Sequence, residues 1–319
     1  RLEMENELRH AIDRGELQLH YQPNVRVADT VVIGAEALVR WNHPTRGVIP
    51  PADFIALAEE TGLILPLGAL VLDEACRQVA EWAAAPAGLP DDFYVSVNLS
   101  TRQLVDPNLL HRVSRAILQS GIPARALCLE ITETALLEDA EGALDVLRKL
   151  RGLGLRIALD DFGTGYSAIS ALHRLPIHTL KIDRSFVADV VTEPATAALV
   201  QGLLQLGRGM GLQVIAEGIE DLDQAAWLLD HGCAMAQGYA FGRPAPLPSP
   251  TEVLLGELID APAEIVAGEL MPEPLPPMRM PAPRIDPAAA FHHDFPTDET
   301  GGFVLRHELM DDLADPDEE

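Results

Sequence analysis

The sequence predicts an α/β fold in which strands and helices alternate and close into a modified (β/α)8 barrel of the TIM type, with the first strand antiparallel. Short runs rich in β-branched residues recur eight times, and stretches with amphipathic helical spacing lie between most of them. Only a short polar link, Ala28–Thr30, joins the first two runs, and it is too short for a crossover helix. A doubly wound open sheet is the alternative that this pattern allows.

The predicted elements follow one another along about 250 residues, the usual size of such a barrel. The predicted strands are 17–25, 31–41, 93–100, 127–134, 155–163, 179–187, 213–220 and 236–242. The predicted helices are Leu65–Ala84, Leu104–Ser120, Ala135–Leu153, Ala195–Gly211 and Leu222–His231.

A change of composition marks the end of the predicted barrel. The segment "SPTE", Ser249–Glu252, is typical of a capping box with proline at the first helical position, and it predicts a last helix ending near Ile259. The residues after it are rich in proline and acid. We therefore assign residues 1–259 to the barrel and expect 260–319 to be a largely disordered tail.

Charge and cysteine content restrict the function. The formal net charge of −26, from 49 acidic and 23 basic residues, argues against DNA binding and against attraction to anionic lipid. Cys76, Cys128 and Cys233 are widely spaced in apolar surroundings, which indicates reduced thiols in a cytoplasmic domain. No apolar run reaches the roughly 18–20 residues that insertion of this segment into a membrane requires. This observation is also compatible with a longer parent protein that is anchored to a membrane elsewhere.

Polar side chains stand at the carboxyl ends of consecutive predicted strands. Glu36 lies within the otherwise apolar run "VVIGAEALV", where an isolated buried carboxylate would need a compensating partner. Because these strand ends form one rim of a barrel, we expect the polar groups to gather at one opening. They are Glu36, Asn98, Glu130, Glu133, Asp160, Asp161, Lys181, Asp183, Glu217 and Gln237.

Several carboxylates at one opening must share protons or bind cations. Oxygen ligands without histidine suit Mg²⁺ or Mn²⁺ better than zinc. Asp160 and Asp161 would both face the opening only if the strand ends there, and the glycines of "DDFGTGYS" permit such a turn. One aspartate would then bridge two metals while its neighbour binds the second, an arrangement used for in-line displacement at phosphorus.

Residues 8–255 resemble the EAL-domain cyclic di-GMP phosphodiesterases, because "EAL", "NLS", "EITE", "DDFGTGYS", "KID", "AEGIE" and "QGYAFGRP" occur in the family's order and spacing. The resemblance implies hydrolysis of cyclic di-GMP to linear pGpG by a water activated by two Mg²⁺ or Mn²⁺ ions per active site. It also implies a homodimer formed through the loop after Asp161. The resemblance is also compatible with a sensor or cyclase-like domain upstream in a longer parent protein.

The resemblance assigns roles to individual residues. One metal would be held by Glu36, Asn98, Glu130 and Asp160, and the other by Asp160, Asp161 and Glu217. The catalytic group would comprise Lys181, Glu217 and Glu133. Lys181 would contact the water or the phosphate, and Glu133 would anchor the loop 163–167. For Glu217 we favour the role of metal ligand over that of general base. Substrate contacts would come from Gln22, Leu38, Arg40, Asp183 and Gln237, with Arg40 on a phosphate.

Two other functions compete with this interpretation. The same barrel would serve as a receptor if it captured cyclic di-GMP without cleaving it, but no expected ligand position is substituted. A metal-dependent barrel enzyme of the enolising or aldol type needs a catalytic base facing a carbonyl substrate, and only Lys181 is available. We expect His43 to shape a turn, and we assign no metal to the pair His292 and His293.

Overall fold

The structure is a computed structural model that describes residues 1–85, 88–136, 140–163 and 172–246. The predicted last helix, 249–259, and the acidic segment 260–319 lie outside the described residues, as do His292 and His293. The boundary at residue 259 therefore stays a prediction.

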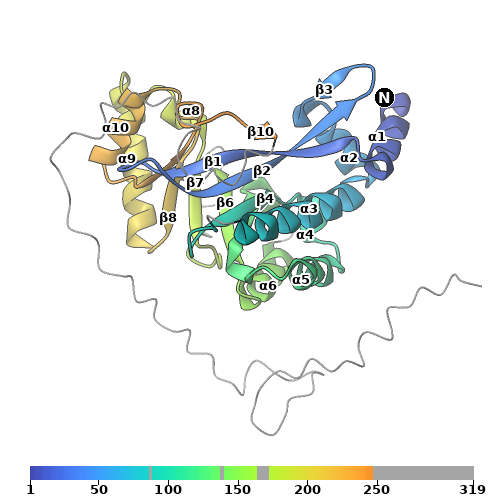
Figure 1. Ribbon diagram of the computed structural model, residues 1–319. Helices are drawn as coiled ribbons and strands as arrows, with labels where there is room; N and C mark the ends of the chain where they lie inside the picture. Colours follow the sequence, from blue (N-terminus) through green and yellow to red (C-terminus); the bar gives the residue numbers. More distant parts are fainter. Residues whose placement is uncertain (86–87, 137–139, 164–171, 247–319) are drawn as a thin grey trace, which may run out of the picture. The chain divides into compact units, whose positions relative to one another are not determined.

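Eight strands close into a barrel (Figure 1). The barrel strands are β1 (Leu17–Arg26), β2 (Val31–His43), β4 (Tyr94–Asn98), β5 (Leu127–Thr132), β6 (Arg156–Phe162), β7 (Thr179–Ile182), β8 (Gln213–Ala216) and β9 (Met235–Gln237). β1 runs antiparallel to both β2 and β9, and every other pair of neighbours in the barrel is parallel. The predicted fold and its antiparallel first strand are confirmed, and closure through β1 and β9 excludes the open sheet.

Two short strands extend the barrel on β1 and β2. β3 (Gly47–Ile49) continues the β1–β2 hairpin, and β10 (Ala245–Pro246) pairs with β1. The turn between β2 and β3 depends on His43, whose Nδ1 accepts hydrogen bonds from the backbone N–H groups of Thr45 and Arg46, each at 3.2 Å. The turn-forming role predicted for His43 is confirmed.

Helices pack outside the barrel and bury one apolar face each. The longer helices are α3 (Ile64–Ala84), α5 (Leu109–Ser120), α6 (Ala140–Gly152), α9 (Pro194–Gly209) and α10 (Leu222–Asp230). All five coincide with predicted helices, with one correction. The helix predicted for 104–120 starts only at Leu109, because a separate short helix, α4 (Thr101–Leu104), precedes it: Ser100 and Gln103 form a capping box that starts α4, and Pro107 has no N–H to continue it.

Several elements, among them a helix of 13 residues near the N-terminus, were not predicted. They are α1 (Leu2–Arg14), α2 (Ile55–Thr61), α8 (Arg184–Val187) and the 3₁₀ turns η1 (Pro51–Asp53), η2 (Ala124–Ala126) and η3 (Thr134–Leu136). α1 buries only Leu8 and Ala11 fully, so its sequence carries a weak apolar stripe. The predicted strand 179–187 was too long, since Asp183 ends β7 and caps α8 with its carboxylate.

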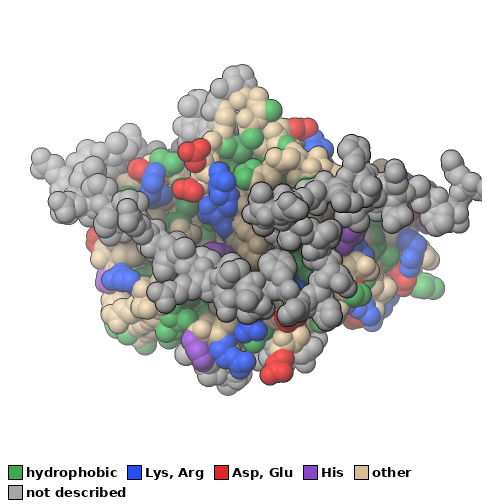
Figure 2. Space-filling view, turned by 90° about the horizontal axis from the view of Figure 1, so that it is seen from below, with side chains coloured by type: hydrophobic (Ala, Val, Ile, Leu, Met, Phe, Trp, Pro, Cys, Tyr) green, Lys and Arg blue, Asp and Glu red, His purple; other side chains and the backbone are tan. Residues whose placement is uncertain are grey.

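The core fills the space between the strands and the outer helices. Trp41 is fully buried and packs edge-to-face on Phe54, and Trp82 packs in the same way on Tyr21. Within the described residues no helix has the length and hydropathy to cross a bilayer. Figure 2 shows the face seen from below, where acidic, basic and hydrophobic side chains are interspersed.

The half-buried His178 makes the stability of this fold depend on pH. Its Nδ1 accepts a hydrogen bond of 3.2 Å from the backbone N–H of Ile157 in β6. Burial, followed by the charges of Arg151 and Arg156, lowers the pKa of His178 from 6.5 to about 4. Between these pH values the unfolded chain binds a proton that the folded chain excludes, so we expect stability to be lost as pH falls from 6.5 to 4.

Urea unfolding of the wild type and His178→Asn over this pH range measures the effect. The asparagine carbonyl can accept the same N–H but does not titrate. We therefore expect the free energy of unfolding of the wild type to fall more steeply toward low pH than that of the variant. Parallel pH profiles for the two proteins would contradict the role of His178.

Candidate active site

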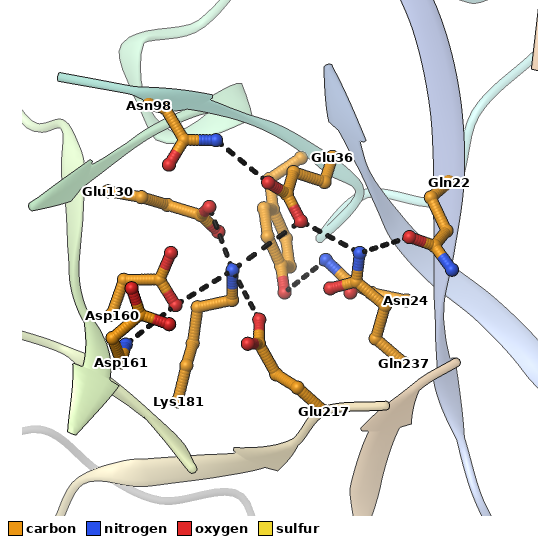
Figure 3. A network of polar contacts seen from close by, with 11 residues as sticks. Gln22, Asn24, Glu36, Asn98, Glu130, Asp160, Asp161, Lys181, Glu217 and Gln237 are labelled. Atoms are coloured by element: carbon orange, nitrogen blue, oxygen red, sulfur yellow. Dashed lines mark hydrogen bonds and ion pairs between the residues drawn. The ribbon is translucent and has the colours of Figure 1, made fainter. Parts of the chain in front are cut away.

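The barrel interior gathers the predicted strand-end residues at one opening (Figure 3). Each comes from a different strand or from the residue that follows it, and their side chains converge. The converging residues are Glu36 (β2), Asn98 (β4), Glu130 (β5), Asp160 (β6), Lys181 (β7), Glu217 (after β8) and Gln237 (β9). The sequence pattern therefore placed these groups correctly relative to the barrel.

Lys181 is the cation at the centre of this cluster. Its side chain is fully buried, with 0% exposure of the residue. The ammonium Nζ lies 2.8 Å from Glu130 Oε2 and 2.6 Å from Glu217 Oε1. It also lies 3.3 Å from Asp160 Oδ1 and 3.5 Å from Glu36 Oε2. One buried charge thus faces four carboxylates from four segments of the barrel.

Glu36, which lies among apolar residues in the sequence, has the compensating partners that a buried carboxylate needs. Asn98 Nδ2 donates to one of its carboxylate oxygens at 2.8 Å, and Gln237 Nε2 donates to the other at 2.8 Å. The Lys181 ammonium supplies the opposite charge. The carboxylate is therefore compensated by a cation and oriented by two amides.

The surroundings of these acids shift their pKa values in different directions. Burial alone would raise the pKa of Glu36, but Lys181 and the hydrogen bonds from Gln237 and Asn98 together lower it. Burial raises the pKa of Glu130 well above its usual range and that of Glu217 to about 8, against the opposing effect of Lys181. Burial, and after it repulsion by the neighbouring acids, thus favours the protonated form of Glu130 and Glu217, while the donors around Glu36 favour its ionised form.

Asp160, Asp161 and Glu217 form a second group, here called the carboxylate trio. One oxygen from each lies within 4.8 Å of the others. Asp161 adopts a left-handed backbone conformation, with φ 53°, and the pairing of β6 with β7 shifts register between Leu159 and Phe162. This irregularity brings oxygens of both aspartates close to Glu217, but the expectation that the strand ends at the aspartates is wrong, because β6 continues through both of them to Phe162.

The donor set of the trio fits a hard divalent cation. It offers carboxylate oxygens without nitrogen or sulfur, which suits Mg²⁺ or Mn²⁺. The other predicted ligands are Glu36, Glu130 and Asn98. Glu36 and Glu130 form ion pairs with Lys181, and Asn98 donates an N–H to Glu36. The division of these ligands between two metals stays a prediction.

The two glutamines predicted as substrate contacts lie in the protein interior and bind one another. Gln237 Nε2 donates to Gln22 Oε1 at 3.1 Å as well as to Glu36, and Gln22 Nε2 donates to the carbonyl of Gly242 at 3.1 Å. A further buried hydrogen bond, not anticipated from the sequence, is donated by Asn24 Nδ2 to the hydroxyl of Tyr94, at 3.4 Å. The glutamine pair thus forms a support for Glu36.

The remaining predicted residues take varied positions. Glu133 is buried and accepts a long hydrogen bond, 3.4 Å, from the backbone N–H of Gly163, which agrees with its predicted role in anchoring the loop; residues 164–167 of that loop lie outside the described residues. Arg40 donates to the carbonyl of Val39, in its own strand. Leu38 and Asp183 line a cleft, and Asp183 also caps α8.

The cleft above the cluster has a volume of about 350 Å³. Glu36, Asp161 and Glu217 line it together with Gln22 and Gln237. The lining residues Arg184, Glu220 and Tyr239 were not predicted, because they follow strand ends in segments predicted as strand. Tyr239 is 52% exposed, and the Arg243 guanidinium lies over its ring, 4.1 Å from the ring centre.

Comparison with known proteins agrees with this geometry. The family model described as "EAL domain" matches residues 5–244. The chain belongs to the EAL domain family. The match covers the whole described barrel and includes every residue of the carboxylate cluster.

Relatives of this EAL domain are larger proteins. An uncharacterized signaling protein of Caulobacter vibrioides is 47% identical over 247 residues, covering 77% of this chain and 30% of that protein. The bifunctional diguanylate cyclase/cyclic di-GMP phosphodiesterase MucR of Pseudomonas aeruginosa is 42% identical over 245 residues, covering 77% of this chain and 35% of MucR. The chain thus spans about a third of the length of these relatives.

Solved structures share the barrel of this EAL domain. The PaMucR phosphodiesterase in complex with c-di-GMP superposes with a TM-score of 0.71 at 42% identity, covering 76% of this chain and 96% of that one. The EAL enzyme Bd1971, with cAMP and cyclic-di-GMP bound, superposes with a TM-score of 0.73 at 34% identity, covering 77% of this chain and 66% of that one.

The central position of Lys181 predicts a large effect of its removal. Lys181→Met removes the ammonium but keeps an unbranched side chain. Glu36, Glu130 and Glu217 would lose their compensating charge, so we expect the free energy of unfolding in EDTA-containing buffer to fall by about 3–5 kcal/mol. Urea denaturation followed by circular dichroism measures this change.

Lys149→Met is the matched control for this substitution. Lys149 Nζ lies 2.8 Å from Asp145 Oδ2 on the exposed face of α6. We expect the control to change the free energy of unfolding by less than about 1 kcal/mol. Equal losses in the two variants would contradict the central electrostatic role of Lys181.

Proposed function

We propose that this EAL domain hydrolyses cyclic di-GMP to linear pGpG in a reaction that depends on Mg²⁺ or Mn²⁺. The observation that carries the proposal is the carboxylate trio, two members of which, Asp161 and Glu217, line a cleft, and two of which, Asp160 and Glu217, contact the buried Lys181. The similarity to MucR, whose name describes a cyclic di-GMP phosphodiesterase, supports the same substrate.

Among the residues suited to hold divalent cations, Glu36, Asp161 and Glu217 line the cleft. Asp160, Asp161 and Glu217 would hold one ion, and Glu36, Asn98, Glu130 and Asp160 would hold the other by similarity to the family. When bound, such ions supply hydroxide near neutral pH and offset charge on phosphoryl oxygens. Catalytic roles of Lys181 and Glu217 belong to the same proposal.

The chain's own residues prepare the site for an anionic phosphodiester. Lys181 Nζ provides a positive charge beside the acids, where it can stabilise negative charge on a phosphoryl oxygen. Gln237 and Asn98 fix the Glu36 carboxylate in one orientation. Glu133 supports Gly163 and, through it, the strand end that carries Asp160 and Asp161.

The cleft rim offers groups suited to a guanine nucleotide. Arg184 at the rim and Arg40 near Glu36 provide positive charge in a chain of net charge −26, and Tyr239 provides an aromatic face. Leu38, Asp183, Gln22 and Gln237 would border the substrate. Local cations are needed because the protein as a whole repels an anionic ligand.

Other properties of the molecule are part of this proposal. We place the domain in the cytoplasm, in keeping with three free, buried cysteines. We expect a homodimer through the loop after Asp161, whose residues 164–171 lie outside the described residues. The activity and partners of any longer protein that contains this chain are proposals as well.

Removal of one carboxylate of the trio tests the enzymatic proposal. Asp160→Asn keeps the shape of the side chain but removes the charge that it shares with Lys181 and the trio. We expect the rate of cyclic di-GMP hydrolysis with Mn²⁺ to fall by about 10³-fold, equivalent to several kcal/mol of transition-state stabilisation. Chromatographic separation of cyclic di-GMP from pGpG measures the rate.

The matched control is Asp145→Asn, which removes an exposed aspartate on α6 and should leave the rate unchanged. Retained hydrolysis in Asp160→Asn would refute the proposed role of this residue. Binding of cyclic di-GMP by the wild type without any linear product would establish the receptor function instead.

A further inference from the structure

The short helix α8 lies between the two chain segments that carry the carboxylate trio. It follows β7, and the Asp183 carboxylate caps it by accepting hydrogen bonds from the backbone N–H and the hydroxyl of Ser185. Asp183 and Arg184 line the same cleft as Asp161 and Glu217. α8 is therefore placed to contact both sides of the trio.

The ring of Phe186 in α8 occupies the space beside Gly163. A methyl group on Gly163 would lie 2.8 Å from Cε2 and 3.0 Å from Cζ of this ring, closer than carbon atoms normally approach. Gly163 has φ +100°, a conformation that glycine adopts without strain. The end of β6, the strand that carries Asp160 and Asp161, thus packs directly on Phe186.

Arg184 makes an equally close contact on the other side. A methyl group on Gly218, which follows Glu217, would lie 2.2 Å from Cβ and 3.2 Å from Cα of Arg184. The backbone N–H of Glu217 also donates to the carbonyl of Ile182, at 3.0 Å, just before α8 begins. The backbone that carries Glu217 is therefore fixed against the start of α8.

A buried glutamine joins the end of α8 to the same segment. Gln224 of α10 is 6% exposed. Its Nε2 donates to the carbonyl of Ala188 at 3.1 Å, and its Oε1 accepts from the backbone N–H of Glu220 at 2.8 Å. α8 and residues 217–220 thus form one connected unit, and Phe186 is its contact with the end of β6.

We propose that Phe186 is a positioning residue for the carboxylate trio. Packed on Gly163, it holds the end of β6 where oxygens of Asp160 and Asp161 lie within 4.8 Å of an oxygen of Glu217. This inference rests on the proposed function, in which the trio holds a divalent cation. Groups that orient metal ligands typically contribute a factor of 10–100 to affinity without touching the ion.

Calorimetric titration of Mn²⁺ into the 319-residue chain tests the proposal. We expect Phe186→Ala to weaken Mn²⁺ binding by about 10- to 100-fold, and Phe186→Leu, which keeps part of the contact, to weaken it less. The matched control is Phe54→Leu, which trims a fully buried ring packed on Trp41. The control should lower the unfolding temperature while leaving Mn²⁺ affinity unchanged.

Mn²⁺ affinity of Phe186→Ala equal to that of the wild type would overturn the proposal. If Phe186→Ala does not fold, Phe186→Leu decides: weaker Mn²⁺ binding than in Phe54→Leu supports the positioning role, and equal binding overturns it. Hydrolysis of cyclic di-GMP by the wild type is measured separately. If Mn²⁺ binding depends on Phe186 but the wild type does not hydrolyse cyclic di-GMP, the proposed function is refuted and this inference stands. If the wild type hydrolyses cyclic di-GMP but Mn²⁺ binding does not depend on Phe186, this inference is refuted and the proposed function stands.

Discussion

The ion pairs of Lys181 connect the fold to the site. Its ammonium lies within 3.5 Å of carboxylates from β2, β5, β6 and the end of β8. Glu36 and Glu217 are far apart in the sequence and meet at this cation only because the strands close into a cylinder. An uncompensated carboxylate in this interior would be strongly unfavourable, so the barrel, the lysine and the acids depend on one another. Burial alone would lower the pKa of Lys181, but the surrounding acids raise it by more, so the pKa of Lys181 lies well above its usual value.

A chain of hydrogen-bonded amide groups orients the carboxylate of Glu36. Gly242 accepts from Gln22, Gln22 accepts from Gln237, and Gln237 donates to Glu36. Neutral side chains in these positions hold a carboxylate in place without adding to the electrostatic repulsion among the acids. The hydrogen bonds also connect β1, β2 and β9, the three strands that meet where the antiparallel first strand closes the barrel. Buried networks of this kind favour one arrangement over its alternatives, because a rotated amide would leave a buried donor unsatisfied.

Sequence reasoning located the barrel and the acids because both depend on local pattern. Runs such as "VSV" and "IAL" mark strands, and the polar residue that follows each run stands at the strand end. The partners of those residues depend on three-dimensional proximity, which the sequence does not encode locally. Alternation directs Lys181 inward between Leu180 and Ile182, but four acids meet it only through barrel closure. Likewise, α8 was predicted as strand because "KIDRSFV" is apolar enough for one, and only the Asp183 cap shows that the strand stops.

The backbone at Asp161 argues that the trio has a function beyond packing. A left-handed conformation at a residue other than glycine costs roughly 1–3 kcal/mol and persists only where the surroundings impose it. Here it brings Asp161 next to Asp160 and Glu217. Burial and the like charges of Asp160, Asp183 and Glu36 raise the pKa of Asp161, so folding incurs both backbone strain and repulsion. A sequence selected for stability alone would place glycine or asparagine at this turn and keep one acid fewer. Retention of the carboxylate in a strained position is what a cation site requires, because a bound ion converts the repulsion among the three acids into attraction.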